Sequence, residues 1–183
     1  MLYEERKIKC PKCGKNIKMK MIKELNVDNL DATISRDIFK FRCVYCKNEI
    51  IVDYATIFTG SNYEICYKTS KKHSNKEYSR ICDDFDDFKE KLLIFSDGLN
   101  DIVIEFVKDY LRTLINEKNI DIRFDSKNNE NLVFYIMEKN RYIGFDINQY
   151  QKLLSHSKIK KIKKFKDINH TNYLKYIKVS IWI

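Results

Sequence analysis

The chain has 183 residues, of which 44% are apolar, so it can bury a core and is not a disordered tail. No uncharged run approaches the ~18 apolar residues of a membrane span, and the start MLYEERKIKC lacks the apolar stretch of a signal peptide. The net charge is +9, and residues 131–183 carry 11 basic against 3 acidic side chains. We therefore expect a cytoplasmic protein, away from membranes, whose basic C-terminal third meets an anionic partner.

Four of the six cysteines form two Cys-x-x-Cys pairs, Cys10 with Cys13 and Cys43 with Cys46. In a reducing cytoplasm such thiols are interpreted first as metal ligands. Two turns of this kind aim four thiolates at one point, and four thiolates fill the tetrahedral shell of a structural Zn²⁺ without leaving a place for water. The spacing predicts one structural zinc ion; the alternative is four unrelated buried thiols.

The two turns are encoded differently. In the first, Pro11 presets the turn and Gly14 permits the positive φ that follows it. The second lacks both residues, so Lys47 and Asn48 must supply the turn. Cys66 and Cys82 have no partner at ligand spacing, and we interpret them as small core residues.

Residues 1–70 are predicted to form a zinc-ribbon β domain. Ile17, Met19 and Met21 alternate with lysines, as expected for a strand with one buried face. Residues 30–39 space apolar side chains by four, which predicts a helical turn inserted between the two cysteine pairs. Residues 49–58 and 63–68 predict two strands joined by a turn at 59–62, and we expect one sheet of short antiparallel strands.

Residues 71–183 are predicted to form a helical hairpin followed by a basic α/β segment. After the polar stretch 68–79, Asp83 and Asp84 can cap a helix, and a break at 96–98 precedes a second helix through residue 115. Residues 132–146 predict a β-hairpin, residues 148–155 a short helix, and residues 173–183 a closing strand or, alternatively, a helix. The fold class predicted is therefore α+β.

Four segments together resemble the CpXC family of bacterial and archaeal zinc-ribbon proteins: KIKCPKCGKNIKM, LNVDNLDATISRDIFKFRCVYC, EIIVDYATIF and FKEKLLIFSDGLNDIVIEFVKDYL. The likeness covers about residues 8–115. It implies that the four paired cysteines hold the metal, although the second pair departs from the usual Cys-Pro-x-Cys-Gly. It also implies a helical signature made of Glu90, Lys91, Asp97, Gly98, Leu99, Asp101, Glu105 and Lys108. The resemblance leaves the biochemical activity open.

The first functional hypothesis is a non-catalytic module that binds nucleic acid or a ribonucleoprotein. Its basis is a run of six lysines in residues 158–166: Lys158, Lys160, Lys161, Lys163, Lys164 and Lys166. The alternative is a solvated edge strand or helix face guarded by charge. Because the run has no arginine, we expect binding that is sensitive to salt and weakly specific.

The second hypothesis is an adaptor that binds another protein through the helical hairpin. Asp101, Glu105 and Asp109 recur at i, i+4 and i+8 and could present an acidic stripe to a basic partner. Such a stripe can also be the solvated face opposite the core.

An enzyme fits the sequence least well. No histidine stands at motif spacing from a cysteine, serine or carboxylate, and there is no glycine-rich phosphate loop. The acidic cluster of Asp83, Asp84, Asp86 and Asp87 could bind Mg²⁺, but a helix cap explains it better.

Overall fold

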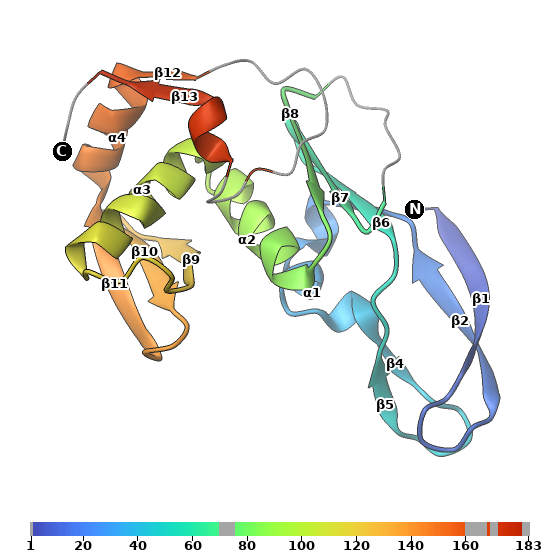
Figure 1. Cartoon of the computed structure of the whole chain (residues 1–183). Helices are drawn as coiled ribbons and strands as arrows, with labels where there is room; N and C mark the ends of the chain where they lie inside the picture. The colour runs from blue at the N-terminus through green and yellow to red at the C-terminus, as the bar shows by residue number, and fades with distance from the viewer. Residues whose placement is uncertain (1, 70–75, 160–167, 169–171, 181–183) are drawn as a thin grey trace. The chain divides into compact units, whose positions relative to one another are not determined.

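The computed structural model describes residues 2–69, 76–159, 168 and 172–180 (Figure 1). It divides into two compact units, residues 1–89 and 90–183. The described residues contain four α-helices and several small sheets, so the predicted α+β class is confirmed. The division into domains at residue 70 stays a prediction.

The first unit begins with an antiparallel hairpin of β1 (Tyr3–Lys9) and β2 (Asn16–Ile22). Because successive side chains of a strand point to opposite faces, β2 buries Ile17, Met19 and Met21 while its lysines are exposed. This confirms the alternation predicted from the sequence.

A helical insert follows the short strand β3 (Glu24–Asn26), as the spacing of residues 30–39 predicts. It consists of the 3₁₀ turn η1 (Val27–Asn29), α1 (Leu30–Ile34) and the 3₁₀ turn η2 (Asp37–Phe39). The chain then forms a second hairpin, β4 (Lys40–Arg42) with β5 (Glu49–Ile51).

The expectation of a single antiparallel sheet is wrong. The two hairpins are separate two-stranded sheets, and a third sheet has the order β3-β6-β7-β8, with β6 at Thr56–Thr59, β7 at Tyr63–Tyr67 and β8 at Tyr78–Cys82. In this sheet β3 pairs with β6, and β7 with β8, in parallel. Parallel neighbours need a long connection between them, and the inserted segments 27–55 and 68–77 provide it.

Aromatic rings form the core of this unit. The ring centroids of Phe39 and Tyr54, and those of Tyr67 and Phe88, are each 4.9 Å apart. Phe85 packs edge-on against Phe39 at 5.7 Å. Such contacts add about 0.5–1.5 kcal/mol per pair to the stabilisation from buried area.

The predicted pair of helices is confirmed as α2 (Phe85–Ser96) and α3 (Asp101–Leu114). Gly98 adopts φ 68°, and the N–H of Leu99 donates to the carbonyl of Ile94 at 2.9 Å, which ends α2. The side chain of Asn100 then accepts from the N–H groups of Ile102 and Val103, which starts α3.

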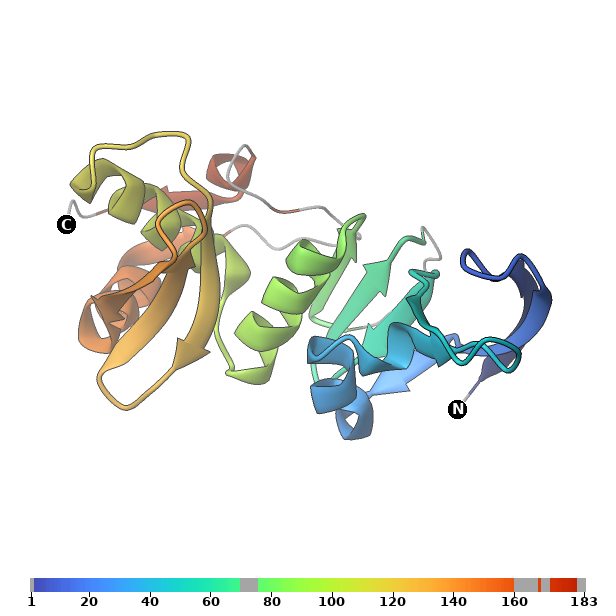
Figure 2. The same cartoon turned by 90° about the horizontal axis from the view of Figure 1, so that it is seen from below.

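The second unit packs these elements on an antiparallel sheet of order β11-β10-β9. Its strands are β9 (Ile122–Lys127), β10 (Asn131–Ile136) and β11 (Arg141–Asp146), followed by α4 (Ile147–His156). The chain closes with β12 (Ser157–Ile159), the turn η3 (Tyr173–Lys175) and β13 (Ile177–Val179), which pairs with β12. Figure 2 shows the three-stranded sheet in front of α3 and α4, with which it shares one hydrophobic core.

Candidate metal centre

The first cysteine turn follows β1. The carbonyl of Cys10 accepts from the N–H of Gly14 at 2.9 Å, and the N–H of Cys10 donates to the carbonyl of Lys15 at 2.9 Å. Gly14 has φ 70°, the positive value that the sequence predicts at this place.

The second turn, between β4 and β5, repeats the same bonds. The carbonyl of Cys43 accepts from the N–H of Lys47, and the N–H of Cys43 donates to the carbonyl of Asn48, both at 2.9 Å. Here Lys47 takes the left-handed position, with φ 60°. The absence of glycine therefore leaves the turn geometry unchanged and adds some backbone strain at one residue.

The four cysteines of the two turns come together. Their Sγ atoms all lie within 4.8 Å of one another, with 3.8 Å between Cys10 and Cys46 and 3.7 Å between Cys13 and Cys43. A tetrahedron of thiolates around zinc, with Zn–S near 2.3 Å, has edges of about 3.8 Å. Cys10 and Cys43 are buried. The group fits a four-coordinate metal ion.

In each turn, backbone N–H groups favour the thiolate form of the first cysteine by lowering its pKa. The N–H of Cys13 is the main cause that lowers the pKa of Cys10, and the N–H of Cys46 lowers the pKa of Cys43 to about 6. At Cys13 the N–H of Lys15 acts in the same sense, but burial and the neighbouring thiols outweigh it and raise the pKa to about 11. Four thiolates at this spacing repel one another, and a divalent cation offsets that repulsion.

The other two cysteines lie outside this group. Cys66 and Cys82 are buried in β7 and β8. Burial, and then the charge of Glu64, raises the pKa of Cys66 to about 12, which makes this thiol unreactive at neutral pH.

Two residues of the predicted acidic stripe are buried in the second unit. Asp101 has 0% and Glu105 has 2% of its surface exposed. Asp109 is partly exposed, and its carboxylate accepts from Arg112 and from the hydroxyl of Tyr173, both at 2.6 Å. The prediction of an exposed partner-binding stripe is therefore wrong for Asp101 and Glu105, and so is the alternative of a solvated face.

These acids belong instead to a buried ionic network between α2, α3 and β9. Nζ of Lys108 lies 3.0 Å from a carboxylate oxygen of both Glu90 and Glu105, and Glu90 also accepts from the N–H of Phe124 at 2.7 Å. Burial alone would raise the pKa of Glu90; Lys108, Lys91 and the Phe124 N–H together lower it.

This network explains much of the helical signature that the family resemblance implies. Five charged residues of that signature are buried in the network: Glu90, Lys91, Asp101, Glu105 and Lys108. One part of the network can be recognised in the sequence. Lys108 stands three residues after Glu105, at the spacing of an ion pair on one helix.

Of the predicted nucleic-acid-binding lysines, Lys158 is exposed in β12, opposite Lys178 of β13. The others lie outside the described residues: Lys160, Lys161, Lys163, Lys164 and Lys166.

The acidic cluster before α2 contains a helix cap. The carboxylate of Asp84 accepts from the N–H of Asp87 at 2.8 Å, within the first turn of the helix.

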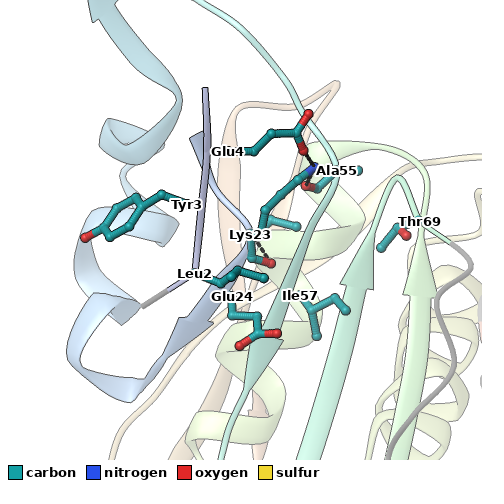
Figure 3. Close-up of a pocket in the computed structure, with 9 residues that line it drawn as sticks. Leu2, Tyr3, Glu4, Lys23, Glu24, Ala55, Ile57 and Thr69 are labelled. Atoms are coloured by element: carbon teal, nitrogen blue, oxygen red, sulfur yellow. Dashed lines mark hydrogen bonds and ion pairs between the residues drawn. The ribbon is translucent and has the colours of Figure 1, made fainter. Parts of the chain in front are cut away.

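A pocket of about 310 Å³ lies in the first unit, where β1 passes β3 and β6 (Figure 3). Leu2 and Ile57 are among its apolar lining residues. Glu4 and Lys23 point toward each other, with Nζ of Lys23 2.8 Å from the carboxylate of Glu4 and 3.4 Å from the carbonyl of Ala55. Lys23, and then Arg6, lower the pKa of Glu4 to about 2. The two charged side chains Glu4 and Lys23 therefore already have each other as partners.

A family model described as CpXC protein matches residues 8–108. The match includes both cysteine turns and α3 as far as Lys108. No curated protein and no solved structure matches the chain. None of the helices in the described residues combines the length and apolar character needed to cross a membrane.

Proposed function

The chain belongs to the CpXC family, and on that premise we propose that its N-terminal part is a zinc ribbon in which the four paired cysteines hold one structural Zn²⁺. The observation that carries this proposal is the Sγ spacing of 3.7–3.8 Å between the two turns. Sulfur ligands in a tetrahedron select zinc among the common divalent ions, and four of them leave no open position for substrate or water. None of the six cysteines forms a disulfide, and we place the protein in the reducing cytoplasm, where thiolates serve as metal ligands.

The metal content of the purified protein tests this proposal. We expect one zinc per chain by elemental analysis, and tetrahedral thiolate absorption bands after exchange for Co²⁺. Cys43→Ser should fall clearly below one zinc per chain, because it removes a ligand. Cys66→Ala is the matched control and should keep one. Full metal content in Cys43→Ser, or iron in place of zinc, would contradict the proposal.

We further propose that the zinc-loaded protein acts by binding nucleic acid or a ribonucleoprotein through the basic C-terminal region. The support is electrostatic: residues 131–183 carry 11 basic and 3 acidic side chains, and six lysines stand within residues 158–166. Lysines neutralise phosphates and release counterions, so the binding should weaken steeply with salt.

Capture from a lysate of the source cells, with and without nuclease, tests this second proposal. Changing Lys160, Lys161, Lys163 and Lys164 to Ala should abolish the recovery of nuclease-sensitive RNA or DNA. The control changes Lys118 and Lys127, two exposed lysines of the second unit outside residues 131–183, to Ala, and it is compared with the change of Lys160 and Lys161 alone, which removes the same charge. Equal losses in both sets would contradict a role for the lysine run.

The alternative function, a protein adaptor that uses the helical hairpin, loses its main support because Asp101 and Glu105 are buried. A nuclease-resistant protein recovered in stoichiometric amount in the same capture would favour it again.

A further inference from the structure

One face of the β1–β2 hairpin gathers four lysines. In the register, Lys7 stands directly opposite Lys18, and Lys9 and Lys20 are two residues away on the same two strands. Directly opposed residues, and residues at i and i+2, share a face of a two-stranded sheet. All four are exposed, whereas the other face buries Met19. The hairpin therefore presents a staggered array of four ammonium groups to solvent, two from each strand, with Lys9 opposite Asn16 and Lys20 opposite Glu5.

The array carries an excess of positive charge, with four lysines against the single carboxylate of Glu5. In the part of the chain that the structure describes, none of the four lysines forms an ion pair, although nearby Lys23 and Lys40 do. Glu5 is the one acidic residue of β1 on this face, and it stands opposite Lys20. Like charges directly opposite each other, as at Lys7 and Lys18, destabilise a sheet. Among the described residues of this unit, no ion pair offsets the repulsion between Lys7 and Lys18. A bound polyanion would relieve it.

An exposed aromatic ring lies at one end of the array. Nζ of Lys20 is 3.9 Å from the ring centre of Tyr3, which is 43% exposed. The similar pair of Lys15 and Tyr45 does not belong to this face, because the bond from the N–H of Cys10 to the carbonyl of Lys15 continues the register and puts Lys15 on the side of Ile17 and Met19. Rings placed beside cations suit unpaired bases, which stack on an aromatic face while their phosphates meet the lysines.

We propose that this face, defined by Lys7, Lys9, Lys18, Lys20 and Tyr3, binds single-stranded nucleic acid. The lysines contact successive phosphates, and Tyr3 stacks on a base. A duplex fits less well because its bases are not available for stacking on a ring. The face carries lysines and no arginine, so it recognises the class of ligand and not a sequence. It is separate from the lysine run 158–166 and goes beyond the function proposed above.

The test measures fluorescence anisotropy of a labelled 12-nucleotide single-stranded RNA, and of its DNA counterpart, with the full zinc-loaded chain. The variant changes Lys7, Lys9, Lys18 and Lys20 to Gln. We expect the affinity near physiological salt to fall at least tenfold. The slope of log K against log salt should fall by about 0.7 for each phosphate that the variant no longer neutralises, hence by up to about 3. Tyr3→Ala should weaken binding about fivefold or more without changing that slope.

The control changes Lys118 and Lys127, two exposed lysines outside residues 131–183, to Gln, and it is compared with the double variant Lys7→Gln and Lys18→Gln, which removes the same charge. Zinc content and circular dichroism verify that each variant is folded. Binding by the hairpin variant within twofold of wild type would overturn the inference, and so would equal losses in both sets. Equal or tighter binding to anionic phospholipid vesicles would assign the face to a membrane and overturn it too. If only the change at residues 160–164 abolishes binding, this face is rejected while the function proposed for the C-terminal region stands.

Discussion

Removal of the metal is expected to unfold the two cysteine turns and the hairpins that carry them. The β1–β2 and β4–β5 hairpins are separate two-stranded sheets, and isolated two-stranded sheets are marginal in water. A structural zinc ion contributes an apparent 10–16 kcal/mol in small zinc-finger peptides at pH 7, and roughly this scale is lost on chelation. Without the ion, the four clustered thiols also repel one another as they ionise.

Hydrogen exchange measures this loss residue by residue. After chelation, the amides of Cys10, Gly14, Cys43 and Lys47 should lose protection, because each makes a hydrogen bond that closes a cysteine turn. Near-UV circular dichroism should also change, since the aromatic core contains Phe39, which immediately precedes β4. Amides of β10, in the second unit, serve as the internal control and should stay protected. Restored zinc should reverse the effect, and an unchanged near-UV spectrum after full metal removal would refute the expectation.

Lys108→Met is expected to destabilise the second unit by about 3–5 kcal/mol. Lys108 is 4% exposed and its ammonium lies between the carboxylates of Glu90 and Glu105. Methionine keeps most of the volume but leaves two buried carboxylates without this cation, and breaking a buried pair from one side costs on this scale. Chemical denaturation of the zinc-loaded protein, followed by exchange of α3 amides, measures the change.

Two variants bracket this result. Lys118→Met changes an exposed lysine shortly after α3 and should stay within about 0.5 kcal/mol of wild type. Lys108→Met combined with Glu105→Met removes both members of one pair and should recover part of the lost stability. If Lys108→Met proves no more destabilising than Lys118→Met, the ionic network does not hold α2, α3 and β9 together.

Because of the same network, we expect the free energy of unfolding to fall at acid pH. The pKa of Glu90 in the folded state lies below its ordinary value of 4.5. Its stabilising contribution is therefore complete above that ordinary value and is lost as the pH falls through the folded-state pKa. In Lys108→Met the main cation that lowers this pKa is gone, so the dependence on pH below about 4.5 should be shallower than in wild type.

The two cysteine turns were predictable because their geometry is local. A Cys-x-x-Cys turn fixes two thiols within four residues, and the pairs at Cys10 and Cys43 fold alike even though only the first has Pro and Gly. The helix boundary at Gly98 and the alternation in β2 follow from backbone conformation and period, which are also properties of a short segment. In each case a few neighbouring residues carry the whole signal.

Strand pairing and the surroundings of the charges were decided only by the tertiary structure. Whether β3 pairs in parallel with β6 depends on how the segment between them returns, and no short window of sequence contains that information. Likewise the sequence places Asp101 and Glu105 on one face of a helix. Whether that face is exposed or buried depends on Lys91, which lies on another helix and pairs with both carboxylates. The sequence by itself thus determined the two cysteine turns and the local elements. The tertiary structure decided which charges are paired inside the protein and which, like the lysines of the β1–β2 hairpin, face the solvent, because pairing requires partners that are distant along the chain.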